Sequence, residues 1–362
     1  MTSPPLELGL VESLLREQFG IAAQAERLTG DRDENFRAHV AQEPGYVFKV
    51  LPVGESAVTG DLLPAVLTHV ERVAGDIPVP RLVRSRDGHS QIRFTDSAGK
   101  TRIASLCTYL PGKLLLSAKR SSRQRRACGQ LLARLAGALR TFEHAACRRE
   151  VAWDVARVPA LASMIPQVPD LPNIAFLQDF VERFSMEVTP CLAKLRHQFV
   201  HNDFNARNIL VDPDDESRVV GIIDFGDAVY TAQAADVAVG VTGQLDTPET
   251  ADEALREFVA AYCELEPLRP EELRLLNWLV AGRIVLNVVR IAWLRLQQSP
   301  GDRNVTGTQW RESRGAPATW DAHFEAFDAS FFRWRVEFAR HLVSPSHPSI
   351  ENAHVSSCFV YK

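Results

Sequence analysis

Two short segments in the second half of the chain carry residue types that suit phosphoryl transfer. The first is HNDFNARN at residues 201–208, and the second is DFGD at residues 224–227. Phosphoryl transfer needs an in-line hydroxyl, metal ions that neutralise charge and phosphates that are held still. Asp203 could accept the proton of the hydroxyl, and the side-chain oxygens of Asn208 and Asp224 are ligands that Mg²⁺ prefers. Together the two segments predict a magnesium-dependent kinase site.

The residues around these segments predict the elements that position them. The stretches FVHN, NILVD and GIID are apolar and predict strands that would anchor a catalytic loop and a metal loop side by side. An isolated HxD or DFG pattern is common in proteins where it has no catalytic function. The two patterns in this order, each at the end of an apolar strand, are far more specific for a kinase.

Bulk properties of the chain argue against several other classes of protein. The 362 residues carry a formal net charge of −4, which gives no electrostatic reason to expect nucleic acid or a membrane as partner. The six cysteines show no metal-binding spacing and fit a reducing compartment. We find no signal peptide, and the apolar stretch 277–294 carries Arg283 and Arg290, which favours a buried or amphipathic helix over a membrane span. We therefore expect a cytoplasmic enzyme that acts on small molecules.

Hydrophobic periodicity divides the chain into a β-rich part and a helical part. Residues 1–110 predict short strands with one inserted helix at 61–74, in which Pro64 would lie in the first turn. Residues 111–343 are mainly helical, and residues 344–362 predict a flexible tail. The predicted fold class is therefore α+β, with a small N-terminal lobe and a larger helical C-terminal lobe that carries the catalytic and metal loops.

The pair HNDFNARN and IDFGD resembles the catalytic and metal loops of the aminoglycoside phosphotransferase and choline kinase superfamily, relatives of the protein kinases. The resemblance extends over most of the chain and implies a protein-kinase-like bilobal fold. It implies that Asp203 is the catalytic base and that Asn208 and Asp224 bind Mg²⁺. It also implies two structural residues, His201 packing beneath the catalytic loop and Asp236 capping that loop from a helix.

The same resemblance assigns nucleotide-binding residues in the N-terminal part. Lys49 lies within the strand YVFKV and would bind the α- and β-phosphates. Its acidic partner on the following helix would be Asp61 or, alternatively, Glu55. The turn GDRDENF is not a glycine-rich loop, but its backbone N–H groups could hold a phosphate, with Asn35 and Phe36 fixing the turn.

The strand before the helical part, ASLCTYLPG, resembles the nucleotide hinge of the superfamily. Backbone groups around Thr108 and Leu110 would bind adenine or guanine there. The resemblance implies Mg²⁺ as cofactor with GTP or ATP as phosphate donor, and the residues leave the choice between the two nucleotides open.

Within the superfamily, the sequence is most similar to the hydroxylysine kinases. The similarity lies in GDRDENF, in Trp153-Asp154, in HNDFNARNILV and GIIDFGD, and more loosely in LVAGRIVLNVV. It implies phosphorylation of the side-chain hydroxyl of 5-hydroxy-L-lysine, with GTP as the donor of that family. Such a substrate needs acids that face its ammonium groups, for which Asp227 and Asp154 are candidates, and a base that faces its carboxylate, for which Arg283 is a candidate. The segment 303–330 departs from the family and could reshape the substrate pocket.

Other functions remain open on the sequence alone. The chain could be another amine kinase, although IDFGD argues against homoserine kinase and the neutral tail argues against an aminoglycoside kinase; choline kinase is a further alternative. A non-catalytic pseudokinase would require loss of the base, the lysine or a metal ligand, and all of these are present. A scaffold built on the kinase fold has no supporting feature, and no APE-like segment follows DFG as a protein kinase would require.

Overall fold

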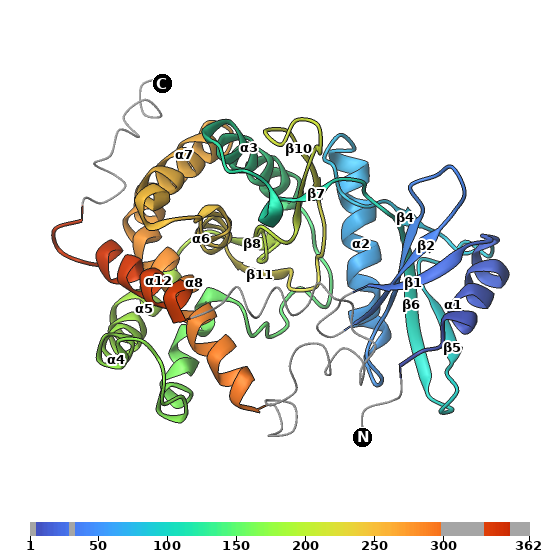
Figure 1. Ribbon diagram of the computed structural model, residues 1–362, viewed down its shortest axis with the longest axis horizontal. Helices are drawn as coiled ribbons and strands as arrows, with labels where there is room; N and C mark the ends of the chain where they lie inside the picture. Colours follow the sequence, from blue (N-terminus) through green and yellow to red (C-terminus); the bar gives the residue numbers. More distant parts are fainter. Residues whose placement is uncertain (1–4, 29–32, 298–328, 348–362) are drawn as a thin grey trace. The chain divides into compact units, whose positions relative to one another are not determined.

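The described part of the chain forms two compact units, which Figure 1 colours along the sequence. This computed structural model describes residues 5–28, 33–297 and 329–347. The N-terminal unit contains the described residues up to Pro111 together with His144–Ala146, and the C-terminal unit contains the rest. The predicted flexible tail and the segment 303–330 lie mostly outside the described residues.

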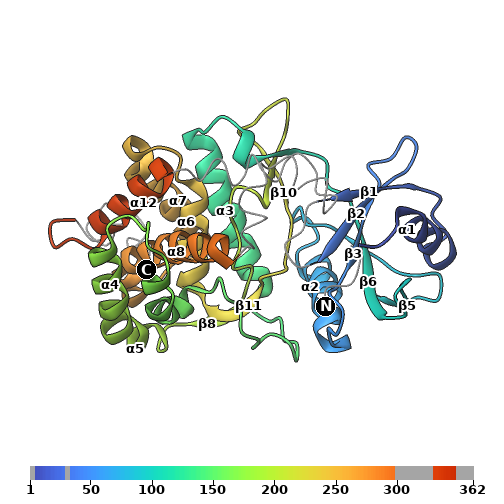
Figure 2. The same cartoon turned by 60° about the horizontal axis from the view of Figure 1, so that its bottom comes forward.

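A six-stranded antiparallel sheet makes up most of the N-terminal unit, with the order β1-β2-β3-β6-β4 and with β5 paired to β6. In Figures 1 and 2 the sheet lies between helices α1 and α2. Alternate strand residues such as Phe36, Phe48 and Leu106 are fully buried and form a core with α1. The elements are α1 (Leu8–Leu14) with the π-helical turn Leu15–Phe19, β1 (Gln24–Leu28), β2 (Glu34–His39), β3 (Tyr46–Val50), α2 (Ala57–Val73), β4 (Leu82–Val83), β5 (Ile92–Thr95) and β6 (Thr101–Thr108).

Helix α2 begins earlier than the sequence predicts. Ser56 is its N-cap, and the Ser56 hydroxyl accepts a hydrogen bond from the Thr59 N–H. Pro64 therefore lies inside the helix rather than in its first turn, where the absence of its N–H removes one helical hydrogen bond. The prediction was wrong because it used Pro64 as the start signal and overlooked the Ser56 cap.

The C-terminal unit is mainly helical and carries two small sheets, with strand orders β10-β9-β7 and β11-β8. Helix α6 is buried along its whole length, and Figure 1 shows it among α3, α7 and α8. The strands are β7 (Lys113–Leu114), β8 (His197–Val200), β9 (Ile209–Val211), β10 (Val219–Ile222) and β11 (Val229–Ala232). The helices are α3 (Ser122–Leu139), α4 (Ile174–Arg183), α5 (Thr189–Leu192), α6 (Gln233–Gln244), α7 (Ala251–Cys263), α8 (Pro270–Gln297) and α12 (Ala329–Leu342), with shorter 3₁₀ or π turns at 115–117, 155–163, 165–167, 184–188 and 248–250. The mixture of an antiparallel sheet and a helical unit confirms the predicted α+β class.

Helix α8 is long and apolar enough to cross a membrane by length and composition. However, 67% of its most apolar window is buried inside the protein, where the helix packs against α6 and α12. This burial agrees with the helix that the sequence predicts, and Arg283 of α8 is buried inside the C-terminal unit.

Candidate active site

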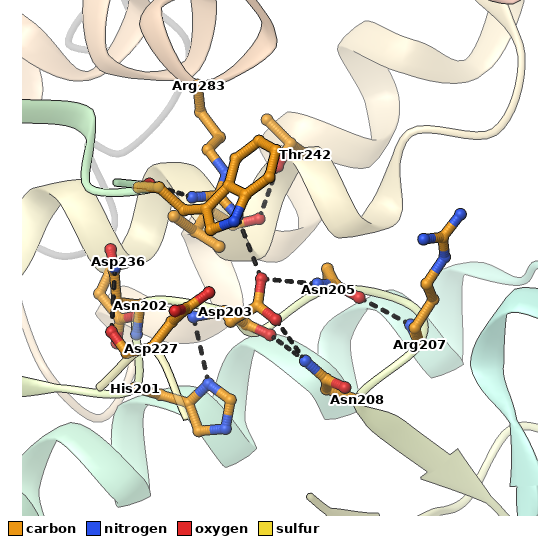
Figure 3. Close-up of polar contacts among 12 residues, drawn as sticks. His201, Asn202, Asp203, Asn205, Arg207, Asn208, Asp227, Asp236, Thr242 and Arg283 are labelled. Atoms are coloured by element: carbon orange, nitrogen blue, oxygen red, sulfur yellow. Dashed lines mark hydrogen bonds and ion pairs between the residues drawn. The ribbon is translucent and has the colours of Figure 1, made fainter. Parts of the chain in front are cut away.

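The segment HNDFNARN forms a loop between β8 and β9, and Figure 3 shows its polar contacts. Asn202 has a φ of +60°, in the left-handed region that asparagine tolerates better than most residues. The Asn202 N–H donates to Oδ1 of Asp236 at 2.7 Å, and Asn202 Nδ2 donates to the carbonyl of Asp227 at 3.1 Å. The loop backbone is therefore held both by helix α6 and by the DFGD turn.

Asp236 lies on α6 and accepts hydrogen bonds from the loop that it caps. Burial raises the pKa of Asp236 to about 7, and the backbone N–H groups of Asn202 and His201 act in the opposite direction by favouring the charged carboxylate. This is the capping position that the resemblance implied for Asp236. Its contacts lie on the backbone of the loop, so its part in the site is structural.

His201 lies fully buried beneath the loop and joins it to the strand that precedes Asp224. The Asp203 N–H donates to Nδ1 of His201 at 3.2 Å, and His201 Nε2 lies 3.2 Å from the carbonyl of Ile223. Burial lowers the pKa of His201 to about 4, so the imidazole is neutral and its Nε2–H donates to Ile223. The ring packs edge-on against Phe225. The position is the structural one expected for His201.

The Asp203 carboxylate is held by three side chains. Oδ1 accepts a hydrogen bond from Asn205 Nδ2 at 2.7 Å and lies 3.1 Å from Arg283 Nη2, while Oδ2 accepts from Asn208 Nδ2 at 2.6 Å. Burial raises the pKa of Asp203 to about 7, and Arg283 opposes this rise. A positioned carboxylate with a pKa near neutrality is suited to accept a proton from a hydroxyl group.

Asn208 and Asp224 present oxygens that fit Mg²⁺. Both hydrogen bonds from Asn208 Nδ2 go to Asp203, and Asn208 Oδ1 has no hydrogen-bond donor within the described part of the chain. The Ile223 N–H donates to the carbonyl of Asn208, which places Asp224 one residue beyond this contact. Asp224 is exposed, and its Oδ1 accepts a hydrogen bond from the Gly226 N–H. One amide oxygen and one carboxylate match the few protein ligands that Mg²⁺ takes alongside water and phosphate.

Two contacts of the site were missed by the sequence analysis. Asn205 contacts Asp203 and also accepts a hydrogen bond from the Arg207 N–H, a short-range pattern that its place two residues after Asp203 could have indicated. Arg149 donates from Nη2 to the carbonyls of Gly226 and Ala228 and so holds the DFGD turn. Arg149 lies far from that turn in sequence, and nothing in its surroundings marks it.

The residues predicted to bind the acceptor occupy different environments. Arg283 is 4% exposed, contacts the Asp203 carboxylate and also donates to the carbonyl of Trp153, so both contacts shown for it lie within the protein. Asp154 is buried, and its Oδ1 accepts from the Ala156 N–H, which makes it the cap of the turn at 155–163. Asp227 lies beside Asp203 in Figure 3, and its charge contributes to the raised pKa of Asp203. Of these three predicted residues, only Asp227 lies where its carboxylate could bind an acceptor beside Asp203.

In the N-terminal unit, Lys49 lies in the middle of strand β3 and is mostly buried. Its Nζ forms an ion pair with Oδ2 of Asp33 at 2.9 Å. The predicted partner, Asp61, accepts a hydrogen bond from the Ser90 hydroxyl at 3.2 Å and lies 3.6 Å from His144 Nε2. The acid in this ion pair comes from the turn before β2, and the pairing of Lys49 with Asp61 or Glu55 stays a prediction.

The predicted phosphate turn lies partly outside the described residues, at positions 29–32. Phe36 is fully buried in strand β2, with the guanidinium of Arg27 4.7 Å from its ring centre, so it packs in the sheet core. Asn35 pairs in register with Lys49 across β2 and β3. Both residues thus support the sheet on which Lys49 lies.

The two predicted hinge residues differ in their free backbone groups. The Thr108 N–H donates to the carbonyl of Arg81, and the Thr108 hydroxyl accepts from the Arg81 N–H, each at 2.9 Å. Leu110 lies beyond the end of β6, and its N–H has no hydrogen bond to any described residue. A nucleotide base could therefore use the backbone of Leu110 but would compete with Arg81 for the N–H of Thr108.

Comparisons with known proteins agree with this geometry. Residues 24–276 match the model of the phosphotransferase enzyme family. Hydroxylysine kinase of Mus musculus is 27% identical over 305 residues, covering 78% of this chain and 80% of that protein, and hydroxylysine kinase of Bos taurus is 25% identical over 316 residues, covering 81% and 84%.

Solved structures are similar at the level of the fold. An amicoumacin kinase in complex with AMP-PNP, Ca²⁺ and Ami has a TM-score of 0.62 at 15% identity, and the match covers 92% of each chain. A microcompartment-associated aminopropanol kinase has a TM-score of 0.59 at 14% identity, covering 93% of this chain and 96% of that one. The predicted kinase-like fold is therefore confirmed.

Proposed function

Because the chain belongs to the phosphotransferase enzyme family, we propose that this small-molecule kinase transfers the γ-phosphate of GTP or ATP to the hydroxyl of 5-hydroxy-L-lysine. The observation that carries the reaction class is the Asp203 carboxylate, held by Asn205, Asn208 and Arg283 with a pKa raised to about 7. Support for the acceptor comes from relatives named hydroxylysine kinase that match about four-fifths of both chains.

The residues of the C-terminal unit have distinct parts in the proposed reaction. Asp203 accepts the proton of the attacking hydroxyl and orients that oxygen toward the phosphorus. Arg283, Asn205 and Asn208 keep the carboxylate in one rotamer, so it needs no reorganisation when the acceptor arrives. Asn208 Oδ1 and the Asp224 carboxylate would hold Mg²⁺, which supplies positive charge to the phosphate oxygens of the donor.

The N-terminal unit supplies groups for the nucleotide. The Lys49 ammonium would bind donor phosphates, and the nucleotide would then replace Asp33 as its anionic partner. The Leu110 N–H would donate to the purine base. Backbone contacts of this kind serve adenine and guanine alike, so the donor assay must decide between ATP and GTP.

The charged acceptor needs partners of both signs, and two residues of the C-terminal unit meet that need. The Asp227 carboxylate lies beside Asp203 in Figure 3 and would bind an ammonium group of the substrate. Arg290 is half-buried, with its guanidinium over the ring of Trp153. Burial lowers the pKa of Arg290, and the negative charge of Asp227 opposes this shift. We therefore assign the substrate carboxylate to Arg290, on the same helix as the residue first predicted, because Arg283 is already engaged with Asp203.

A matrix of donors and acceptors tests the proposal. Purified protein is assayed for release of GDP or ADP with both diastereomers of 5-hydroxylysine, with lysine, choline, homoserine and an aminoglycoside. We expect turnover with hydroxylysine and none with lysine, which lacks the hydroxyl. Asp203→Asn serves as the control for a contaminating kinase. Faster turnover with an aminoglycoside or choline would replace the proposed acceptor, and nucleotide binding without turnover of any acceptor would indicate a pseudokinase.

The charge assignments have a separate test. Asp227→Asn and Arg290→Met should each raise KM for hydroxylysine, and Asp227→Asn should affect an acceptor without the second amine less. Thr231→Val, which removes a hydroxyl bonded to the capping residue Asp154, provides a control that leaves these charges in place. A KM for hydroxylysine unchanged in both charge variants would remove Asp227 and Arg290 from the acceptor site.

A further inference from the structure

A second polar cluster lies in the C-terminal unit, outside the contacts that surround Asp203. Asp252 is in the first turn of α7, His341 is in the last turn of α12, and His347 lies in the turn after α12. His347 Nε2 is 3.2 Å from Asp252 Oδ1, and His341 Nε2 is 3.6 Å from Asp252 Oδ2. The two imidazole rings are perpendicular, with centroids 4.5 Å apart. Neither the predicted kinase motifs nor the proposed reaction uses these residues.

The spacing of the cluster suits a single metal ion. One ligand atom from each of the three residues lies within 4.8 Å of the other two. Ligands of a tetrahedral Zn²⁺, bound at roughly 2.0–2.2 Å, lie about 3.2–3.6 Å from one another. The two distances to Asp252 already fall in that range, and the separation of the two histidine nitrogens is at most 4.8 Å. Two imidazoles and one carboxylate are a donor set typical of zinc.

Asn277 of α8 gives an independent indication of a ligand. Asn277 is only 8% exposed, its Nδ2 faces His347 Nδ1 at 3.3 Å, and its Oδ1 has no hydrogen-bond partner among the described residues. A buried amide oxygen without a donor is costly. If the amide turns by half a rotation, Oδ1 takes the place of Nδ2 and accepts a hydrogen bond from the Nδ1–H of His347. The tautomer with Nδ1–H then leaves the Nε2 lone pair available to a metal.

This arrangement matches a general feature of metal-binding histidines. Such a histidine almost always donates its second ring N–H to a neighbouring acceptor, which sets the tautomer and the orientation of the ring. In the metal-free arrangement Nε2–H of His347 can donate to Asp252, and Asn277 donates to Nδ1. When a metal binds Nε2 of His347, that nitrogen no longer donates to Asp252. The ring proton is then on Nδ1, which donates a hydrogen bond to Asn277 Oδ1.

We propose that Asp252, His341 and His347 bind one Zn²⁺ ion, with Asn277 orienting His347 from behind. The site would connect the start of α7, the interior of α8 and the end of α12. Helix α12 packs along α8, as Figure 1 shows. The ion would therefore fasten the end of α12 to the helical core and stabilise the C-terminal unit. Its function is structural and does not depend on the identity of the phosphate acceptor.

Metal titration of the full-length protein tests the site directly. Protein stripped with a chelator is titrated with Zn²⁺ in a calorimeter and with Co²⁺ in a spectrophotometer, without nucleotide and in excess Mg²⁺. We expect one ion per chain, with visible cobalt bands but without the near-ultraviolet sulfur-to-cobalt absorption that cysteine ligands produce. His341→Gln and His347→Gln should each weaken binding by about tenfold or more.

His39 provides the matched control for loss of a histidine. It forms an exposed pair with Glu26 at 2.7 Å in the N-terminal unit, so His39→Gln should bind zinc as the wild type does. Zinc should raise the Tm of the wild type and of His39→Gln but not of the double variant His341→Gln/His347→Gln. Cobalt absorption from sulfur, no binding at all, or equal binding by the double variant would each overturn the proposal. Near-ultraviolet circular dichroism in chelator shows whether each variant is folded.

Asn277 allows a sharper experiment that does not remove a ligand. Asn277→Asp keeps an acceptor for the Nδ1–H of His347, whereas Asn277→Leu has a similar volume without one. We expect Asn277→Leu to lower zinc affinity by about 10–100-fold and Asn277→Asp to bind at least as tightly as the wild type. Equal affinities in the two variants would contradict the role given to Asn277 and with it the proposed orientation of His347.

Discussion

Asp203 in the C-terminal unit and Lys49 in the N-terminal unit are held by different kinds of contact. The Asp203 carboxylate receives hydrogen bonds from two side chains of its own loop and contacts Arg283 from α8. The Lys49 ammonium forms an ion pair with the carboxylate of Asp33, in the turn before β2. The first arrangement fixes a group before any ligand arrives, while the second offers a charge whose partner a phosphate can replace.

The energetic difference follows from the kind of contact. A hydrogen bond to a charged group contributes about 1.5–3 kcal/mol, and removing one partner of a buried set leaves the others unsatisfied. The Lys49–Asp33 contact is a single ion pair between side chains that are 13% and 16% exposed, so both charged groups keep some contact with water. Substitutions in the Asp203 network should therefore have large effects on catalysis or stability, and loss of Asp33 should have a small effect on stability.

The largest effect should come from Asp203→Asn. The variant keeps the shape of the side chain but loses the group that accepts the hydroxyl proton, so we expect kcat to fall by about 10²–10⁴-fold. Nucleotide affinity, measured by calorimetry, should stay close to that of the wild type. The control is Asp212→Asn, because Asp212 pairs with Arg218 in the turn after β9 and has no part in the reaction. Activity in Asp203→Asn equal to that of the control would exclude Asp203 as the base.

A smaller effect should appear in the pH dependence of Arg283→Met. Asp203 is active when deprotonated, so kcat/KM should fall as the pH drops through about 7. The charge of Arg283 lowers the pKa of Asp203, and its removal should move this acidic limb to higher pH by about 1–3 units. Arg283→Lys keeps the charge and should move the limb much less. Profiles of kcat/KM against pH would refute the assignment if the wild type and Arg283→Met coincided.

Asp236→Ala tests the backbone support of the same loop. The substitution leaves the buried N–H of Asn202 without its acceptor, which should lower the free energy of unfolding by about 1–3 kcal/mol. Urea denaturation followed by tryptophan fluorescence measures this loss. Asp170→Ala, at an exposed turn, is the control and should change stability little. Equal midpoints for the two variants would show that the cap contributes nothing to stability.

The local parts of the site could be predicted from sequence because short-range chemistry determines them. The loop HNDFNARN, its flanking strands and the DFGD turn lie close together in the chain, so their order and their apolar surroundings indicate both structure and chemistry. The resemblance placed His201 and Asp236 next to this loop, and the structure shows both in hydrogen bonds with its backbone.

The long-range partners could not be predicted in the same way. The spacing of Arg283 and Arg290 indicates one helix face but does not say which acid that face meets, so Arg283 was assigned to a substrate rather than to Asp203. In the N-terminal unit, several acids lie near Lys49 in sequence, and only the tertiary structure shows that Asp33 pairs with it. The start of α2 could have been predicted locally, because Ser56 is a residue type that caps helices. The prediction instead placed Pro64 in the first turn and began the helix too late.

Loss of the Asp33 carboxylate should have the smallest effect on stability. It is therefore the clearest test of the difference between the surroundings of Lys49 and those of Asp203. Asp33→Asn removes a charge that pairs with Lys49 but keeps the size of the side chain and an amide oxygen that can accept a hydrogen bond from the ammonium, so the free energy of unfolding should fall by about 1 kcal/mol. The same variant should retain turnover, because the proposed reaction uses Lys49 and not Asp33. Lys49→Met should lose nucleotide affinity in parallel assays. A stability loss in Asp33→Asn as large as that of Asp236→Ala would mean that Lys49 is held as firmly as Asp203, and the contrast between the two regions would disappear.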